Sequence, residues 1–589
     1  MKEEMISVDF CIVGGGLAGL AAALAAARHG AKVALVQDRP VLGGNASSEI
    51  RMHVCGAHGE DRRETGIVEE LMLDNYYYNK TPNYAMWDAV LYGKAQYQPN
   101  LTLVLNASVN AVAMEGNHVK SVRAWQLTTE TWITVQAPLF ADCSGDAILA
   151  HLTGADHRMG REGRGEFNES IAPETADART MGMSCLFQAR EHATPQPFTP
   201  FPWANSYSGK DLFWLDGRNV DIYHTNYWWM EIGGMVHSIH DTEKCREELV
   251  RIAFGVWDYI KNYAPDKERF ANFSLDWQSF LPGKRESRRY CGDVILTQND
   301  IAAEGRFEDL VAYGGWTMDD HFPEGFYRRG HGTIFHPAPS PFGIPYRSLY
   351  SRNIANLFCA GRCHSATHSA MSATRVMGTC SLMGQAVGTA AAIATRDGLS
   401  PRAVYERRIA ELQQTLMDDD CWLPWRARAV SGLFREGHVT STGGEGADFV
   451  RNGVDRPWDK CPNAWTGRPG EAVECRFAAE SEIAEVRLVF DSDLNRKDPS
   501  RNRGQSRLLN MRYYRGLDDA PFAPPATLVR DFRIETLAAD GSWHRAADCR
   551  ENFQRLVRVP VKTRACGVRI VPESTWGADI ARIFAFEAH

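Results

Sequence analysis

The 589-residue sequence has no excess of positive charge. Aspartate and glutamate number 73 against 65 lysines and arginines, which gives a formal net charge of −8. A chain with this balance is not expected to seek a nucleic-acid backbone or an anionic membrane surface. The sequence also has no apolar run of membrane-spanning length, and its first residues lack the order of a secretion signal. We therefore expect a cytoplasmic protein without nucleic-acid or membrane partners.

Paired cysteines are also missing. The fourteen cysteines are scattered, and no two of them form a Cys-x-x-Cys pair. This spacing gives no indication of a disulfide framework, a zinc site or an iron–sulfur cluster. We expect mostly reduced thiols and no metal centre. The remaining composition, with 44% hydrophobic and 23% charged residues, is ordinary for a globular protein, and the length suits two to four domains.

The clearest motif lies near the start of the chain. An apolar strand over residues 8–13 runs directly into Gly-x-Gly-x-x-Gly, which is followed by an alanine-rich helix predicted over residues 17–29. In such a turn Gly14 permits the tight bend, Gly16 lets the backbone approach a pyrophosphate, and Gly19 allows close packing of helix on strand. The motif predicts a dinucleotide site. The alternative is an ordinary βαβ turn without a ligand.

The identity of the dinucleotide depends on the next two segments. A second strand over residues 32–36 ends at Gln37 and Asp38, where a carboxylate that binds ribose usually stands at the first position. The loop over residues 42–48 is a second glycine-containing turn rich in small hydrogen-bond donors. Such a loop suits the pyrophosphate and ribityl chain of a flavin, which favours FAD over NAD.

The residue composition and the pattern of helix and strand signals change three times along the chain. Residues 1–157 and 341–430 alternate helix and strand signals, whereas residues 158–340 are rich in glycine, aromatic and charged residues, and residues 431–589 read as short strands joined by turns. We predict an α/β fold. It consists of a discontinuous Rossmann-like FAD-binding domain, an inserted α+β substrate or cap domain, and a C-terminal all-β sandwich.

Several stretches together resemble a known family. They are residues 14–19, 43–51, 141–146, 285–289, 343–347, and 360–362 leading into 372–378. These motifs resemble the FAD-dependent oxidoreductases of the glutathione-reductase-like superfamily, in a bacterial branch akin to fumarate reductase flavoproteins and heterodisulfide reductase A subunits. The resemblance covers roughly residues 6–400. It departs from the usual pattern at Gln37.

The resemblance implies FAD as the cofactor and assigns its contacts. The turn over residues 142–146 would approach FAD again, residues 361–362 would lie at its pyrophosphate or ribityl end, and residues 374–376 would approach the isoalloxazine. The predicted cofactor-binding residues are Gly14, Gly16, Leu17, Ala18, Gly19, Gln37, Asp38, Gly43, Gly44, Asn45, Ser48, Arg51, Ser144, Gly145, Asp146, Gly361, Arg362, Thr374, Arg375 and Val376.

The C-terminal region resembles a discoidin or galactose-binding module. The pattern behind this resemblance is residues 529–535 followed by Gly541-Ser542-Trp543. Such modules bind glycans or only pack on a neighbouring domain, and the sequence leaves both roles open. Aromatic residues of the middle segment can stack on sugar rings or form its core. They are Trp203, Phe213, Trp214, Tyr223, Tyr227, Trp228 and Trp229.

Candidate catalytic residues come from the stretches beside the flavin motifs. Histidine is the side chain best suited to exchange a proton near neutral pH, and His368 and His53 are the leading candidates. His368 would share a helix face with His364 if that stretch is helical. The alternative for each is a hydrogen-bonded structural histidine. Our sequence-based catalytic set also contains Arg285 and Arg288.

The two arginines have two possible roles. Arg285 and Arg288 can clamp a carboxylate or other polar substrate, or they can form an ion-pair network with Glu286 or Asp293. The stretch Asp319-Asp320-His321 offers another acid–base pair, although it is more typical of a solvated loop. Cys55 follows the second glycine loop and is the thiol we consider first for redox activity, and a small buried thiol is the simpler interpretation.

The sequence therefore predicts an FAD-dependent oxidoreductase of the dehydrogenase type. It would transfer hydride to or from the flavin, with a small polar molecule as substrate and a sugar or sugar-derived alcohol as the leading candidate. One alternative is an electron-transfer subunit that works with a protein partner. Another is a glycan-binding protein with a vestigial flavin site. A homo-oligomer is compatible with the sequence.

Overall fold

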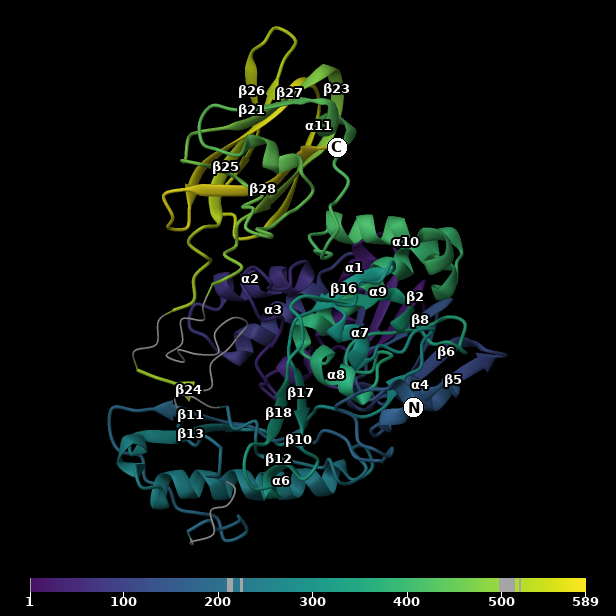
Figure 1. Cartoon of the computed structure of the whole chain (residues 1–589), viewed down its shortest axis with the longest axis vertical. Coiled ribbons are helices and arrows are strands. Elements are labelled where there is room, and N and C mark those ends of the chain that lie inside the picture. Colours follow the sequence, from purple (N-terminus) through teal and green to yellow (C-terminus); the bar gives the residue numbers. More distant parts are fainter. Residues whose placement is uncertain (1, 209–214, 223–225, 497–513, 518–520) are drawn as a thin grey trace. The chain divides into compact units, whose positions relative to one another are not determined.

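The computed structural model describes residues 2–208, 215–222, 226–496, 514–517 and 521–589 (Figure 1). The chain divides into two compact units. Unit 1 contains Met1–His58, Pro82–Leu412 and Asp498–Pro521, and unit 2 contains Gly59–Thr81, Gln413–Lys497 and Phe522–His589. This division differs from the sequence-based one: the FAD-binding and cap segments share one unit, residues 59–81 join the C-terminal unit, and that unit resumes at Gln413 rather than at residue 431.

A parallel sheet forms the centre of unit 1. Its strand order is β20-β8-β2-β3-β4, with every neighbouring pair parallel. The strands are β20 (Leu357–Cys359), β8 (Leu139–Asp142), β2 (Phe10–Val13), β3 (Val33–Val36) and β4 (Leu101–Val104). Strands β2, β3 and β8 are buried along their whole length, as expected for a parallel sheet covered on both faces.

The glycine turn leads from β2 into helix α1 (Leu17–Arg28), which confirms the predicted helix. Helix α1 packs on α9 (Met377–Asp397), and the two lie together in Figure 1. This contact depends on small residues. A Cβ atom at Gly384 would lie 2.0 Å from the Ala18 carbonyl oxygen, and one at Gly388 would lie 2.1 Å from that of Ala22. The two backbones therefore approach as closely as glycine alone permits.

The helix predicted over residues 374–394 is confirmed as α9, which begins three residues later, because the chain bends sharply just before it. Helix α8 (His368–Thr374) ends just before α9, and the two helices meet at an angle of 95°. In the described part of the chain no single helix is long and apolar enough to cross a membrane. Helices α8 and α9 reach the length and apolar composition of a membrane span only when the two are counted together.

A second sheet of unit 1 has the order β1-β7-β6-β5. Its first pair is parallel and the other pairs are antiparallel. The strands are β1 (Lys2–Ser7), β7 (Thr131–Gln136), β6 (His118–Gln126) and β5 (Ala107–Glu115). The other helices of this part of unit 1 are α3 (Tyr84–Gln96) and α4 (Ile148–Thr153), and α10 (Pro401–Asp418) follows α9 and runs into unit 2.

The inserted segment of unit 1 consists of short sheets and one long helix. Helix α6 (Thr242–Asp258) continues as a π-helical turn over Tyr259–Tyr263, close to the predicted helix. The sheets are β12-β10-β14, β13-β11-β24, β15-β9, β16-β19 and β17-β18. Their strands are β9 (His157–Arg158), β10 (Met183–Ser184), β11 (Phe187–Glu191), β12 (Glu231–Ile232), β13 (Phe273–Gln278), β14 (Gly283–Lys284), β15 (Arg289–Tyr290), β16 (Leu310–Gly314), β17 (Met318–His321), β18 (Thr333–His336), β19 (Phe342–Pro345) and β24 (Tyr514–Arg515), and the short helices are α5 (Arg164–Phe167) and α7 (Gln298–Ala302).

Unit 2 is built mainly of antiparallel strands, which confirms the predicted all-β character of the C-terminal part. The strands join in one hydrogen-bonded sheet of order β22-β28-β23-β27-β25-β26, with β21 on β23. They are β21 (His438–Ser441), β22 (Trp465–Gly467), β23 (Val473–Phe490), β25 (Val529–Leu537), β26 (Trp543–Cys549), β27 (Leu556–Thr575) and β28 (Ala581–Ala588). Helices α2 (Ile67–Tyr78) and α11 (Gly432–Glu436) belong to the same unit.

Candidate functional site

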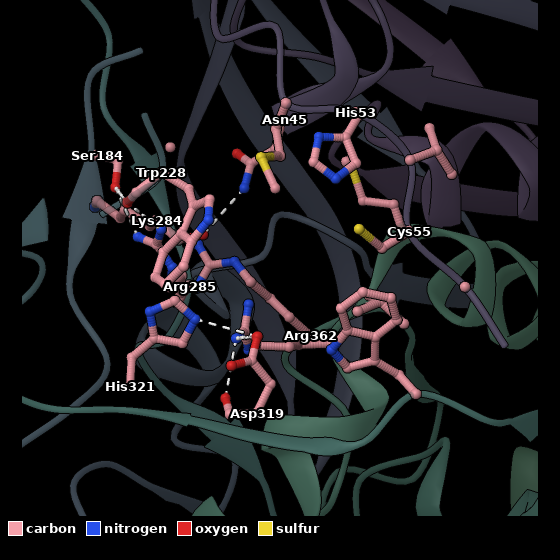
Figure 2. Close-up of a pocket in the computed structure, with 18 of the residues that line it drawn as sticks. Asn45, His53, Cys55, Ser184, Trp228, Lys284, Arg285, Asp319, His321 and Arg362 are labelled. Carbon is pink, nitrogen blue, oxygen red and sulfur yellow. Dashed lines mark hydrogen bonds and ion pairs between the residues drawn. The ribbon is translucent and has the colours of Figure 1, made fainter. Parts of the chain in front are cut away.

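Unit 1 contains a cavity of about 630 Å³. One side is formed by the extended segment that follows the second glycine loop and by the start of α9, and the other by residues of the inserted segment. Figure 2 shows His53 and Cys55 on one side and Arg285, Asp319 and His321 on the other. The lining residues are Asn45, Ile50, Met52, His53, Val54, Cys55, Gly56, Ala57, His58, Ser184, Leu186, Trp228, Gly283, Lys284, Arg285, Trp316, Thr317, Asp319, His321, Phe335, Arg362, Arg375, Val376 and Met377.

The two glycine turns form what we call the glycine cradle, residues 14–19 together with residues 43–44. A Cβ atom at Gly14 would lie 2.5 Å from the backbone of Cys143, and one at Gly19 would lie 1.8 Å from the Gly14 carbonyl oxygen. At Gly16 the nearest atom to a Cβ would be the Gly44 Cα, 4.0 Å away. Gly14 and Gly19 are therefore required by the fold, whereas Gly16 faces open space.

That open space suits a pyrophosphate. The first residue before α1 is Gly16, and no side chain caps the N-terminus of the helix. The N–H groups of a helix N-terminus attract anions, and here no capping side chain competes for them. The backbone N–H of Gly43 donates to the Gly15 carbonyl oxygen at 2.8 Å, which fixes the second turn beside the first. The residues present thus fit the phosphates of FAD.

Gln37 braces the turn from the side. Its Oε1 accepts a hydrogen bond from the Gly15 backbone N–H at 2.7 Å, and its Nε2 donates to the Val41 carbonyl oxygen at 3.2 Å. The side chain is buried, whereas the Asp38 carboxylate is 60% exposed. Gln37 thus has a structural role in the cradle that the sequence did not indicate. Ribose binding by Gln37 and Asp38 stays a prediction.

The turn over residues 142–146 is held by the buried carboxylate of Asp142 and the partly buried carboxylate of Asp146. Asp142 accepts hydrogen bonds from the backbone N–H of Ser144 at 2.9 Å and of Leu149 at 2.8 Å, and burial raises its pKa. Asp146 pairs with Arg362 at 2.6 Å and with Lys284 at 2.7 Å. Burial opposes ionisation of Asp146, but these two cations outweigh it and hold its pKa well below the usual range.

Only some of the other predicted cofactor-binding residues line the cavity. Asn45, Arg362, Arg375 and Val376 line the cavity. Among the described residues, Ser48, Arg51 and Thr374 are not part of its lining. The Ser48 N–H donates to Asp88, Arg51 donates to Gln188 at 2.7 Å, and the Thr374 hydroxyl lies 3.3 Å from His364. The remaining predicted contacts belong to the turns described above or adjoin them, and they are Leu17, Ala18, Ser144, Gly145 and Gly361.

His368 does not reach the cavity. Its Nδ1 lies 2.9 Å from the Glu286 carboxylate and its Nε2 lies 3.0 Å from that of Asp320. Burial would lower the pKa of this histidine, but the two carboxylates outweigh it and raise the pKa to about 10. His368 is thus an imidazolium held inside an ion-pair network, and because it is not part of the cavity lining we do not assign it the catalytic proton transfer. The expected shared helix face with His364 is also absent, because α8 begins at His368.

His53 does line the cavity, but as a neutral side chain. Burial lowers its pKa to about 4. Its Nδ1 lies 3.0 Å from the amide nitrogen of Asn226, whose carbonyl oxygen accepts the Trp228 backbone N–H at 3.2 Å. Because that second bond fixes the amide, Asn226 donates to Nδ1 and the ring proton of His53 belongs on Nε2. His53 is therefore built to donate a hydrogen bond rather than to accept a proton.

The two predicted arginines differ in position. Arg285 lines the cavity, where it donates to the Ser184 hydroxyl and to the Trp228 carbonyl oxygen, both at 2.9 Å. Arg288 donates to the Asp146 carbonyl oxygen at 3.3 Å and, in the described part of the chain, is not a lining residue. The predicted clamp therefore reduces to Arg285, whose ionic partner is Glu231 at 3.4 Å rather than Glu286 or Asp293.

His321 lines the cavity, although our sequence-based catalytic set did not contain it. It ends strand β17 and is buried, so the expectation of a solvated loop over residues 319–321 was wrong. Its Nδ1 lies 2.5 Å from Glu231 and its Nε2 lies 3.2 Å from Asp319. Burial would lower its pKa, but these carboxylates outweigh it and raise the pKa above its ordinary value. The signal in the sequence was the Asp-x-His spacing.

We call Arg285, Asp319, His321 and Arg375 the polar wall. Arg375 donates to the backbone oxygen and to the carboxylate of Asp319, both at 3.1 Å. The Asp319 carboxylate loses solvation on burial, but His321 and Arg375 hold its pKa well below the usual range. Trp228 covers the wall with its ring edge-on to His321, the ring centres lying 5.1 Å apart. The polar wall thus presents several donors and an oriented imidazole to the cavity.

The remaining candidates are accounted for as follows. Cys55 lines the cavity, and all fourteen cysteines, each within the described residues, are thiols rather than disulfides. Of the aromatic group, Trp228 lines the cavity, Tyr227 and Trp229 are buried in the core of the inserted segment, and Trp203 is 46% exposed. Phe213, Trp214 and Tyr223 lie outside the described residues.

Comparison with known families agrees with this geometry. The family described as FAD dependent oxidoreductase matches residues 9–416 of the chain. The protein belongs to this family. It is therefore an oxidoreductase whose cofactor is FAD, and the matched region contains the glycine cradle, the polar wall and the cavity.

Solved structures give a second, weaker similarity. A family 32 carbohydrate-binding module from Streptococcus pneumoniae EndoD is 18% identical and has a TM-score of 0.20, with 27% of this chain and 99% of the module covered. A Clostridium perfringens module in complex with GalNAc-β-1,3-galactose is 10% identical, with a TM-score of 0.19 and coverage of 26% and 96%. At these TM-scores the likeness says nothing of a ligand, and glycan binding by the C-terminal region stays a prediction.

Proposed function

We propose that this protein transfers hydride between FAD and a small polar substrate held in the cavity, and that His321 exchanges the accompanying proton. The single observation that carries the proposal is the pairing of His321, which lines the cavity, with the buried Glu231, with 2.5 Å between Glu231 Oε2 and His321 Nδ1. The parallel sheet and its glycine turn are the arrangement of a Rossmann-like dinucleotide-binding domain, which supports the site of the cofactor. A sugar or sugar-derived alcohol is the substrate we consider first.

The proton transfer follows from the two ring nitrogens of His321. Glu231 accepts the Nδ1 proton and so fixes the orientation of the ring, while Nε2 is directed to Asp319 on the cavity side. FAD, when bound, supplies or accepts the hydride exchanged with the substrate carbon. In the reducing direction the His321 imidazolium, which Glu231 and Asp319 favour, gives its Nε2 proton to the carbonyl oxygen, and an alcohol remains. In the oxidising direction neutral His321, formed above its raised pKa, takes the proton of the hydroxyl group.

Other residues position the reactants. His53 faces the cavity from the opposite side and presents a ring fixed as a hydrogen-bond donor. Trp228 supplies an apolar surface beside His321. Between them the cavity has room for a small molecule next to a flavin ring, and its size is within the usual range of ligand pockets.

The test is reduction of the bound FAD without oxygen. The purified holoprotein is mixed anaerobically with sugars, sugar alcohols and hydroxy acids, and the absorbance of oxidised flavin is followed. Loss of that absorbance with one compound, at a rate that depends on its concentration, is the expected result. Reduction only by a reduced protein partner would instead favour an electron-transfer subunit, and binding without reduction by any compound would overturn hydride transfer.

A further inference from the structure

Two of the cations that line the cavity share a single carboxylate. Lys284 Nζ lies 2.7 Å and the Arg362 guanidinium 2.6 Å from the carboxylate oxygens of Asp146. Arg285 and Arg375, by contrast, each pair with a different carboxylate. Among the described residues, no second carboxylate lies within ion-pair distance of Lys284 or Arg362. These two residues, which we call the cation pair, therefore keep one positive charge that a neighbouring carboxylate does not balance.

The cation pair is largely withdrawn from water. The side chains of Lys284 and Arg362 are 15% and 16% exposed. A charge in such a place is costly without a counter-ion, and it attracts an anion. The position of the cation pair in the fold decides which anion can reach it.

Arg362 lies beside the start of α1. It follows Gly361, where a Cβ atom would lie 3.2 Å from the Ala18 Cβ in the first turn of that helix. The Arg362 Nε would lie 3.0 Å from a Cβ atom at Gly145, in the turn that packs against the glycine cradle. Arg362 is thus close to the helix N-terminus at which we place the pyrophosphate of FAD.

Lys284 approaches the same place from the inserted segment. It ends β14, and its carbonyl oxygen accepts a hydrogen bond from Asn45 Nδ2 at 3.0 Å (Figure 2). Asn45 directly follows Gly44 of the cradle. A Cβ atom at Gly283 would lie 2.8 Å from Ile50 Cγ2, so β14 packs closely on the chain that follows the second glycine loop. Lys284 is therefore held next to the cradle, although the two are distant in sequence.

We propose that Lys284 is a cofactor-binding residue and that the cation pair holds negative charge of the FAD pyrophosphate. A helix N-terminus offers only about half a positive charge, which two ionised phosphates exceed. The unbalanced charge of the cation pair offsets part of the excess, and a lysine ammonium is a compact charge that suits a phosphate oxygen. This inference rests on the cofactor of the family and not on the proposed proton transfer. It assigns part of the cofactor site to the inserted segment, which the sequence assigned to the substrate.

The cation pair is separate from the polar wall. Its carboxylate, Asp146, belongs to the turn that packs against the cradle, whereas Glu231 and Asp319 pair with the arginines of the polar wall and with His321. An anion bound by the cation pair therefore lies on the cradle side of the cavity. FAD brings its phosphates to that side, which favours them over an anionic substrate.

The test measures ligand binding to the full-length apoprotein. Calorimetric titration gives the Kd of FAD, of ADP, which contains both phosphates without the flavin, and of adenosine, which contains neither. Lys284→Gln can still hydrogen-bond to Asp146 but has no charge. It should raise the Kd of FAD and of ADP about 10- to 100-fold, as for a lost charge-assisted contact, and leave the Kd of adenosine unchanged. Unchanged Kd values for FAD and ADP overturn the proposal.

The pattern across the three ligands separates this role from others. A loss for FAD alone would mean that the ammonium contacts the ribityl chain or the isoalloxazine, and it would overturn the contact with the pyrophosphate. An equal loss for all three ligands would mean that the substitution damages the whole site, and it would contradict a contact made through charge.

Two further variants serve as controls. Lys284→Arg keeps the charge and should recover most of the affinity for FAD and ADP. Lys244→Gln removes another lysine of the inserted segment, whose ammonium pairs with Asp241 at 3.2 Å and whose side chain is 86% exposed. It should leave all three Kd values unchanged, and a loss as large as that of Lys284→Gln would reduce the effect to net charge and overturn the proposal.

A second measurement uses the native apoprotein, in case Lys284→Gln does not fold. Lysines are acetylated with acetic anhydride, and the extent of acetylation at Lys284 is read by mass spectrometry. Saturating ADP should lower this extent, and adenosine should not. Acetylation of Lys284 that ADP leaves unchanged overturns the proposal. Because these readouts do not require turnover, their outcome is independent of hydride transfer and of the role of His321.

Discussion

The glycine cradle and the polar wall both belong to unit 1, but they consist of different chemical groups, and of the two only the polar wall lines the cavity. The cradle offers backbone N–H groups and space, because Gly16 has no side chain and α1 has no side-chain cap. The polar wall offers side chains whose charges are set by their neighbours, as in the pairs of Glu231 with His321 and Asp319 with Arg375. Backbone donors suit an invariant phosphate, whereas coupled side chains suit discrimination among substrates and movement of a proton.

Because of this difference, we expect substitutions in the polar wall to leave FAD binding unchanged. The largest expected effect is that of His321→Gln, which keeps a hydrogen-bonding side chain but cannot exchange a proton. We expect flavin reduction to slow by about 10²- to 10⁴-fold, the usual contribution of general acid–base catalysis. The flavin content and visible spectrum should stay unchanged. Stopped-flow absorbance under anaerobic conditions measures the rate. An unaltered rate with FAD bound would remove His321 from the mechanism.

The contrast also explains what the sequence could predict. The cradle is a local motif, in which three glycines, a strand and a helix follow one another, so the turn and helix α1 were predicted correctly from spacing alone. The central sheet followed in the same way from short buried strands. In unit 2, alternating strands and turns were sufficient to predict an all-β fold.

The contacts within the polar wall could not be predicted from local sequence patterns. His321 meets Glu231 across 90 residues and Arg375 meets Asp319 across 56, and no local pattern sets such distances. His368 shows the reverse case: it lies beside a flavin motif in the sequence, but its side chain contacts Glu286 and Asp320. That residues 59–81 belong to unit 2 could not be predicted from the sequence either, because it depends on contacts between residues distant in sequence.

The cradle can be tested separately from the fold with two neighbouring glycines. Gly16 has φ −64° and ψ 177°, which alanine also adopts, and a Cβ there meets only open space. Gly16→Ala should therefore fold normally but obstruct the pyrophosphate, weakening FAD binding by about 1–3 kcal/mol, or roughly 5- to 150-fold. Fluorescence titration of the apoprotein with FAD measures this change.

Gly19→Ala is the matched comparison. A Cβ at this position would lie 1.8 Å from the Gly14 carbonyl oxygen, so the turn itself must shift. We expect a lower unfolding temperature for this apoprotein, in contrast to Gly16→Ala. Full FAD affinity in Gly16→Ala would contradict the placement of the pyrophosphate at this residue.

A smaller effect is expected from the partner of His321. Oxidation of an alcohol requires neutral His321, so the rate should rise with pH through its pKa, and reduction in the opposite direction should fall. Glu231 and Asp319 stabilise the imidazolium against burial and against Arg285. Glu231→Gln removes one of these carboxylates and should move the profile to lower pH, by about 1 to 3 pH units. The measurement is the rate of flavin reduction across pH.

The control for this experiment is Glu248→Gln. Glu248 accepts hydrogen bonds from Asn205 and Tyr327 and is not a lining residue of the cavity in the described part of the chain. Its replacement should leave the pH profile in place. A profile that Glu231→Gln does not move would mean that the observed ionisation belongs to another group.

The smallest effect on rate is expected at His368, which tests the limit of the polar wall. Although burial opposes its charge, Glu286 and Asp320 raise its pKa from 6.5 to about 10, so the charge stabilises the fold fully below pH 6.5, and this contribution disappears as the pH rises towards 10. His368→Gln should therefore lower the unfolding temperature more at pH 6 than at pH 9.5, while flavin reduction stays nearly unchanged. Calorimetry at both pH values and the anaerobic rate measure the two effects. A large loss of rate in a variant that keeps its FAD and its stability would place His368 in the proton path. His368 and its partners would then belong to the catalytic site together with the polar wall.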